Sequence, residues 1–195
     1  PYTYAWTPAS TNSATITNLT SGQYSVTITD ANNCTSTATV AVTDLPGPVA
    51  TLSTQVDVSC NGGNNGSATV QVAGGSAPLT YSWSPSGGSA ASASSLSAGT
   101  YDVTVTDANG CTSTTQVTIA EPTLLNTSIS TSVDLTCNGA NDGSISITAS
   151  GGTPAYSYAW TPASTNTSAI TNLAAGSYSV LVTDLNGCTS TIAAT

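Results

Sequence analysis

The side chains in this sequence that could do chemistry are its cysteines and its carboxylates. The 195 residues include five cysteines and nine aspartates and glutamates, but no lysine, arginine or histidine. General acid–base catalysis would have to rely on aspartate and on the only glutamate, Glu121, and no base is present to activate a serine or threonine nucleophile. The inventory therefore predicts a protein that is not an enzyme.

The cysteines repeat with a fixed period. Cys34, Cys111 and Cys188 follow one another at steps of 77 residues, and Cys60 and Cys137 are separated by the same step. Periodic cysteines without histidine predict disulfides and an oxidising compartment, whereas zinc, the alternative, is disfavoured because no Cys-X-X-Cys pair occurs. We expect the pairs that lie 51 residues apart, Cys60 with Cys111 and Cys137 with Cys188, to form one disulfide per repeat. Cys34 would then pair upstream of the first printed residue.

The carboxylates allow one alternative chemistry, which is calcium binding. If Cys137 bonds to Cys188, two polar loops meet at one end of the last repeat, and their oxygen ligands are Asn138, Asp142, Asp184 and Asn186. Hard oxygen ligands of this kind can hold Ca²⁺. Few of them are carboxylates, however, and Asn-Gly and Asp-Gly also serve as turn residues. We therefore predict no cofactor and no metal, with calcium at these four residues as the alternative.

Aromatic residues show the same period and divide the chain into modules. They recur at steps of 77 residues as Trp6, Trp83 and Trp160, and as Tyr24, Tyr101 and Tyr178. A period of this length indicates an array of similar units, and these six aromatic residues are the predicted core. We place a truncated module 1 at residues 1–45, module 2 at residues 49–121 and module 3 at residues 123–195. Short proline-containing linkers join them, and such linkers are fairly stiff.

Each module is predicted to be an immunoglobulin-like β-sandwich, so the chain is expected to be all-β. In residues 99–106, Tyr101, Val103 and Val105 alternate with polar residues, and no helical period occurs anywhere. A tryptophan on the third strand is typical of the immunoglobulin fold. So is a tyrosine corner, here residues 96–101, in which the phenol hydroxyl bonds back to the preceding turn. Residues 84–95 are expected to hold one or two short edge strands.

Several motifs resemble a known family. Residues 151–160 (GGTPAYSYAW), 173–178 (LAAGSY), 183–188 (TDLNGC) and 137–144 (CNGANDGS) look like the SprB-type repeat. Such repeats occur in tandem in very large surface adhesins of Bacteroidota, including the gliding-motility adhesin. The resemblance covers essentially the whole chain, with small departures such as Asn33 in place of a turn glycine. It implies secretion by the type IX system, attachment at the extracellular cell surface, a filament that contacts substrata, and no catalytic residues.

Charge and composition set the expected partners. The net charge is −9 at pH 7 and no side chain can carry a positive charge, so nucleic acid and anionic membranes are poor partners. No apolar run is long enough for membrane insertion. The expected partners are neighbouring repeats of the same chain, like chains in a filament, and an extracellular substratum or polysaccharide.

The sequence therefore predicts a structural segment of a cell-surface adhesin or filament that acts as a spacer and adhesive stalk. Disulfides would limit how far a stretched module unravels. The alternative is a module array that binds carbohydrate or calcium at the cell surface. Sugar binding would require exposed aromatic rings, whereas the tyrosines and Trp83 share one strand face that is predicted to be core.

Overall fold

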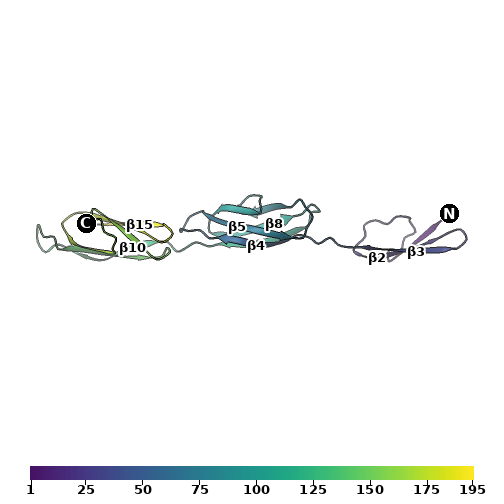
Figure 1. Ribbon diagram of the computed structural model, residues 1–195, viewed down its shortest axis with the longest axis horizontal. Coiled ribbons are helices and arrows are strands. Elements are labelled where there is room, and N and C mark those ends of the chain that lie inside the picture. The colour runs from purple at the N-terminus through teal and green to yellow at the C-terminus, as the bar shows by residue number, and fades with distance from the viewer. The chain divides into compact units, whose positions relative to one another are not determined.

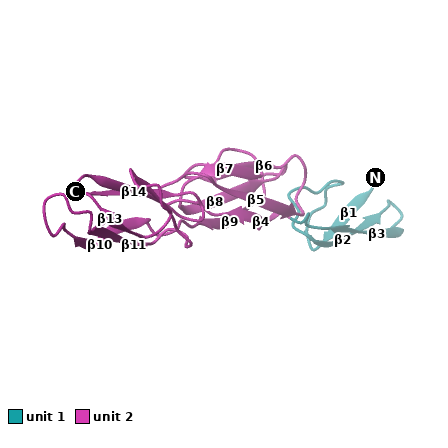
Figure 2. Ribbon diagram, turned by 60° about the vertical axis from the view of Figure 1, so that its left-hand side comes forward, with its two compact units in different colours: residues 1–46 teal, residues 47–195 magenta.

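A computed structural model describes all 195 residues, and its regular structure consists of fifteen β-strands (Figure 1). The chain divides into two compact units, residues 1–46 and residues 47–195 (Figure 2). The first unit is a single antiparallel sheet in the order β1-β2-β3. Its strands are β1 (Thr3–Thr7), β2 (Gly22–Thr29) and β3 (Thr35–Val42).

The second unit contains two β-sandwiches, and each one consists of two three-stranded antiparallel sheets. In module 2 the sheets have the orders β4-β5-β7 and β6-β8-β9, and in module 3 the orders β10-β11-β13 and β12-β14-β15. The all-β sandwich prediction is thus confirmed. The strands of module 2 are β4 (Val49–Val56), β5 (Gly66–Ala73), β6 (Thr80–Ser84), β7 (Ser92–Leu96), β8 (Gly99–Thr106) and β9 (Thr112–Ile119). Those of module 3 are β10 (Asn126–Val133), β11 (Gly143–Ser150), β12 (Ser157–Thr161), β13 (Ala169–Leu173), β14 (Tyr178–Thr183) and β15 (Thr189–Ala194).

The two sheets of each sandwich enclose one hydrophobic core. Val103 and Val105 of β8 are fully buried, as are their counterparts Val180 and Val182 of β14. They are buried because alternate residues of a strand face the same side, so every second residue of these strands points between the sheets. Trp83 and Trp160 complete the two cores at 6% and 4% exposure.

Of the remaining predicted core aromatics, the three tyrosines lie near the start of the central strand of their sheet, and Trp6 lies on an edge strand. Tyr24 and Tyr101 are buried, whereas Tyr178 and Trp6 are half-buried. All three tyrosines form the expected corner, because each hydroxyl donates to the carbonyl four residues before it: Tyr24 to Thr20 at 2.9 Å, and Tyr101 to Ser97 and Tyr178 to Ala174 at 3.0 Å.

The direction of the strands decides which loops meet at each end of a sandwich. In module 2 the Val58 N–H donates to the Ala120 carbonyl at 2.9 Å, so β4 ends beside the end of β9. The Ala50 N–H donates to Ser113 Oγ at 3.1 Å, so β4 begins beside the start of β9. We call the end with Ala120 the C-terminal rim and the end with Ser113 the N-terminal rim, and use the same names in module 3.

The stretch between β6 and β8 holds one strand, β7, and this places the cysteines at opposite rims. Strand β7 pairs antiparallel with β5, and β6 pairs antiparallel with β8. Both β6 and β7 therefore run toward the C-terminal rim, and β8 returns from it. Cys60, which follows β4, lies at the C-terminal rim, and Cys111, which follows β8, lies at the N-terminal rim. The eight residues of β8 span about 25 Å.

Candidate functional site

The candidate site is the junction between modules 2 and 3, where a disulfide joins Cys60 to Cys188. The two residues are 128 positions apart and their Cα atoms are separated by 5.6 Å. The expected pairs, Cys60 with Cys111 and Cys137 with Cys188, do not form. A disulfide needs Cα atoms within about 7 Å, and the members of each expected pair lie at opposite rims of one sandwich. The bond therefore links two modules rather than closing one.

Three cysteines remain unbonded: Cys34, Cys111 and Cys137, all exposed. The prediction of one disulfide per module is therefore not met within this chain. Each free cysteine nevertheless occupies a position equivalent to that of a bonded one. Cys34 and Cys111 correspond to Cys188, and Cys137 corresponds to Cys60, at the 77-residue step.

An aspartate fixes the turn that presents Cys188. We call residues 184–188 the aspartate turn. Asp184 Oδ1 accepts the N–H groups of Asn186 and Cys188, both at 2.9 Å, and its Oδ2 accepts the N–H of Thr153 at 2.8 Å. Asp184 as a whole is only 6% exposed. Three backbone donors converge on one carboxylate, so the loop and the cysteine are held in one conformation.

Module 2 builds the same turn around Asp107. Its Oδ1 accepts the N–H groups of Asn109 and Cys111, both at 2.9 Å, and its Oδ2 accepts the N–H of Ser76 at 3.0 Å. Module 1 repeats the Oδ1 part, because Asp30 accepts the N–H groups of Asn32 and Cys34 at 2.8 and 2.9 Å. The turn is therefore a property of each module and does not depend on the disulfide.

Hydrogen bonds to the carboxylate make these aspartates stronger acids. The N–H of Ser76 is the main reason that the pKa of Asp107 lies below its usual value, and the N–H of Thr153 has the same effect on the pKa of Asp184. Burial acts in the opposite direction on both but does not prevail. The charged form is favoured because it accepts all three donors.

We expect Asp107→Asn to destabilise module 2 and to reduce the loss of its stability as the pH is lowered. Asparagine keeps one acceptor oxygen but turns an NH₂ group toward a backbone donor. The melting temperature at neutral pH should therefore fall by roughly 5–10 °C. Because the folded-state pKa is depressed, the contribution of Asp107 is complete above the unfolded pKa of about 4 and is lost as the pH falls through the folded value. Calorimetry between neutral pH and pH 2 should show a smaller acid loss in the variant.

The matched control is Asp134→Asn, because Asp134 is exposed and no hydrogen bond holds its carboxylate. It should melt as the parent chain does at neutral pH. Equal melting temperatures for the two variants would contradict a structural role for the aspartate turn.

The linker between modules 2 and 3, which is residues 120–125 between β9 and β10, is held from both sides. From module 2, the Gly62 N–H donates to Glu121 Oε2 at 2.6 Å and Asn61 Nδ2 donates to the Pro122 carbonyl at 3.1 Å. From module 3, the Gly152 N–H donates to the Thr123 carbonyl at 2.8 Å. Hydrogen bonds, in addition to the proline, therefore make this linker stiff.

One side-chain contact crosses the junction beside the disulfide. Asn186 Nδ2 donates to the Ser59 carbonyl of module 2 at 3.1 Å and also to Thr153 Oγ1 of its own module at 3.0 Å. In module 2 the counterpart Asn109 makes the second kind of bond, to Ser76 Oγ at 2.8 Å. Asn186 thus docks the aspartate turn of module 3 onto the loop that carries Cys60.

The four calcium candidates do not meet. Asp142 lies at the C-terminal rim, where it accepts the Thr136 hydroxyl and N–H at 2.6 and 3.2 Å. Asp184 and Asn186 lie at the N-terminal rim, because Asp184 bonds to Thr153 beyond the other end of β11. Asn138 follows Cys137 in the loop at the C-terminal rim, so the set is split between the two ends of the sandwich. This arrangement contradicts a shared site, whose loops would have been joined by the bond from Cys137 to Cys188.

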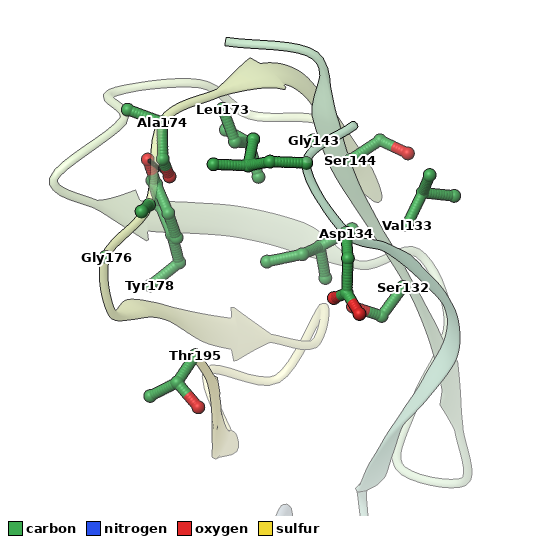
Figure 3. Close-up of a pocket in the computed structure, with 13 residues that line it drawn as sticks. Ser132, Val133, Asp134, Gly143, Ser144, Leu173, Ala174, Gly176, Tyr178 and Thr195 are labelled. Carbon is green, nitrogen blue, oxygen red and sulfur yellow. Dashed lines mark hydrogen bonds between the residues drawn. The ribbon is translucent and has the colours of Figure 1, made fainter. Parts of the chain in front are cut away.

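Module 3 has an open cavity of about 250 Å³ at its C-terminal rim (Figure 3). Figure 3 shows Tyr178 and Thr195 on one side of the opening and Asp134 on the other. In module 2 the same place holds Ile119, which is 1% exposed and lies against Gly66, the counterpart of the cavity residue Gly143. The matching place in module 2 is therefore part of the hydrophobic core, and the comparison gives no support to a ligand site.

Trp83 and Trp160 are not available to stack on sugar rings. The indole N–H of Trp83 donates to the Ala90 carbonyl and that of Trp160 donates to the Thr167 carbonyl, both at 2.8 Å. Both rings lie in the core. No helix in the structure is long enough and apolar enough to cross a membrane.

Comparison with known proteins identifies the repeat. Residues 52–90 and residues 129–165 match the family model described as the SprB repeat, which confirms the resemblance seen in the sequence. The search of the curated proteins found no match to this chain.

Solved structures with similar architecture are arrays of domains. The three N-terminal domains of the Highly Immunogenic Outer Capsid protein (Hoc) of bacteriophage RB49 are 19% identical over 75% of this chain and 58% of that chain, with a TM-score of 0.46. The N-terminal eight Ig domains of Down Syndrome Cell Adhesion Molecule isoform 1.30.30 are 12% identical over 98% of this chain and 32% of that chain, with a TM-score of 0.45. The chain spans less than two thirds of either protein, and neither similarity carries a functional argument.

Proposed function

Because the chain carries SprB repeats at residues 52–90 and 129–165, we infer that it is a structural segment of a large adhesin at the cell surface. In this proposal the modules act as spacers that extend an adhesive stalk, in surface attachment or gliding, and they catalyse no reaction. Secretion by a type IX system in a member of the Bacteroidota follows from the same resemblance. The expected partners are the neighbouring modules and an extracellular substratum.

The observation that carries the proposal is the junction between modules 2 and 3. It combines the disulfide from Cys60 to Cys188 with hydrogen bonds from both modules to the linker. A chain that only needed to keep domains near one another could use a flexible linker. A stalk that transmits force and keeps its reach needs a fixed connection, and a disulfide survives in the oxidising space outside the cell.

The absence of cationic side chains supports the same function. Trypsin-like proteases cleave after lysine and arginine, and this chain contains neither. Its charge of −9 keeps like chains apart in solution. Both properties suit a long exposed protein.

Immunogold labelling of unpermeabilised source cells, with an antibody raised against the whole chain, tests the location. We expect label on extended surface structures, and label that appears only after permeabilisation would contradict the proposal. A glycan array probed with the chain, with and without calcium, tests the spacer role. We expect no glycan to be selected, whereas selective binding would favour the carbohydrate-binding alternative.

A further inference from the structure

We propose that all the cysteines of this chain belong to one series of disulfides, each of which joins two successive modules. We call this series the disulfide ladder and each bond a rung; the bond from Cys60 to Cys188 is one rung. Under this rule the cysteine of an aspartate turn bonds to the module before it, and the cysteine that follows the first strand bonds to the module after it. Cys137 is then the bonding site for a following module, and Cys111 and Cys34 are bonding sites for preceding ones. The inference concerns covalent connectivity and does not depend on adhesion.

The loop that carries Cys137 is held by the same pattern of hydrogen bonds as the loop that carries Cys60. In module 2, the Ser59 N–H donates to Asn65 Oδ1 at 3.0 Å, Asn65 Nδ2 donates to Ser59 Oγ at 2.6 Å, and the Gly63 N–H donates to the Cys60 carbonyl at 2.9 Å. This loop, residues 59–65, is the cysteine loop, and residues 136–142 are its counterpart in module 3.

Module 3 reproduces these bonds with different residues. The Thr136 N–H and hydroxyl donate to Asp142, which takes the place of Asn65, and the Ala140 N–H donates to the Cys137 carbonyl at 3.1 Å. The loop keeps its shape although Cys137 has no partner in this chain. Cys137 is therefore presented at the C-terminal rim as Cys60 is, with its thiol exposed.

The N-terminal rim of module 2 has the same local structure as the N-terminal rim of module 3. The two aspartate turns have the same pattern of hydrogen bonds. In each module, the residue directly before the first strand packs on a glycine. Pro48 lies against Gly75 in module 2, and Leu125 lies against Gly152 in module 3. At the rim of module 3 the preceding module adds two contacts, the disulfide and the bond from Asn186 to Ser59. Cys111 and Asn109 are placed to receive the same two contacts.

Module 1 preserves the turn despite a changed residue. Asn33 takes the place of Gly110 and Gly187, and its φ of 64° is close to their values of 82° and 83°. Asparagine is one of the few residues other than glycine that adopt this left-handed conformation. Cys34 therefore sits in a turn of the same kind.

The chemistry is the oxidation of two thiols by a small disulfide. A thiolate of one module attacks the oxidant, and the thiolate of the adjacent module then displaces the oxidant's sulfur. One S–S bond forms, and the two protons and two electrons lost by the protein reduce the oxidant to two thiols. With oxidised glutathione as the oxidant, each rung yields two molecules of glutathione.

The test is a lengthened chain in which a copy of residues 119–195 directly follows Thr195, because this addition keeps the 77-residue period. Both the parent and the lengthened chain are oxidised with oxidised glutathione, alkylated without reduction and weighed intact. Pepsin digestion at low pH, where thiol exchange is suppressed, then locates the bonds. We expect three alkylated thiols in the parent, at Cys34, Cys111 and Cys137.

In the lengthened chain we expect a new bond between Cys137 and the copied Cys188, so that its seven cysteines again leave three alkylated thiols. The control is Cys137→Ser in the lengthened chain, which should leave four. Five alkylated thiols, with Cys137 and the copied Cys188 both free, would overturn the ladder. A bond within one module, such as Cys60 to Cys111, would overturn it as well.

Discussion

We expect force spectroscopy on the oxidised chain, pulled from its two ends, to show no extension from the residues between Cys60 and Cys188. The disulfide connects these two residues directly, so the force bypasses the 128-residue segment between them. Addition of a reductant should restore this length. At about 3.5 Å per extended residue, the maximum extension should rise by roughly 450 Å, less the folded separation of the two cysteines.

The control is Cys60→Ser in oxidising buffer, which should extend as the reduced parent does. Disulfides within modules 2 and 3 would give a different result, because the segment from Cys111 to Cys137 would then extend without reductant. Extension of that segment in the oxidised parent would contradict the connectivity. The sequence-based idea that a disulfide limits the unravelling of a single module would then regain support.

The period of the cysteines could not distinguish the two connectivities. Cys60 lies 51 residues before Cys111 and 128 residues before Cys188, and these separations differ by one repeat. Either choice joins the same two kinds of cysteine. The deciding fact is which rim each one occupies, and that depends on the number and direction of the strands between them.

The stretch from residue 84 to residue 95 was the point at which the sequence was ambiguous. It is rich in serine, alanine and glycine and has little apolar alternation, so it was compatible with one strand or two. In the structure it holds only β7, which runs in the same direction as β6 because the chain crosses to the other sheet between them. If this stretch had instead formed a strand antiparallel to β6 in the same sheet, β8 would have run in the direction of β6. It would then have ended at the rim that holds Cys60.

The fold itself was predictable because its signals are local. The alternation of residues 99–106 predicts β8 and its buried valines, and the residues around Tyr101 predict the corner bond to Ser97. The calcium hypothesis was wrong because it rested on the wrong disulfide. The role of Asp184 as a turn-forming residue was predicted, but only in part. A carboxylate two residues before an Asn-Gly pair predicts a turn, but not the third donor, Thr153, which lies 31 positions away.

We expect the two halves of the chain to stay joined after the linker is cut. The chain has no lysine or arginine, so Leu124→Lys creates its only trypsin site. Leu124 is 67% exposed, and a lysine there should be tolerated. After digestion in urea, mass spectrometry without reductant should find a single species with the mass of the uncut variant plus one water. Reductant should separate it into residues 1–124 and 125–195.

The matched control carries Cys188→Ser together with Leu124→Lys, and its halves should separate without reductant. Separation in the variant with all its native cysteines would show that no bond crosses the junction in solution. The experiment bears on how such an array could survive outside the cell. Exposed linkers are where proteases attack most readily, and one cut would release everything beyond it. A disulfide that spans the linker makes one cut insufficient, because the modules on either side remain covalently joined through Cys60 and Cys188.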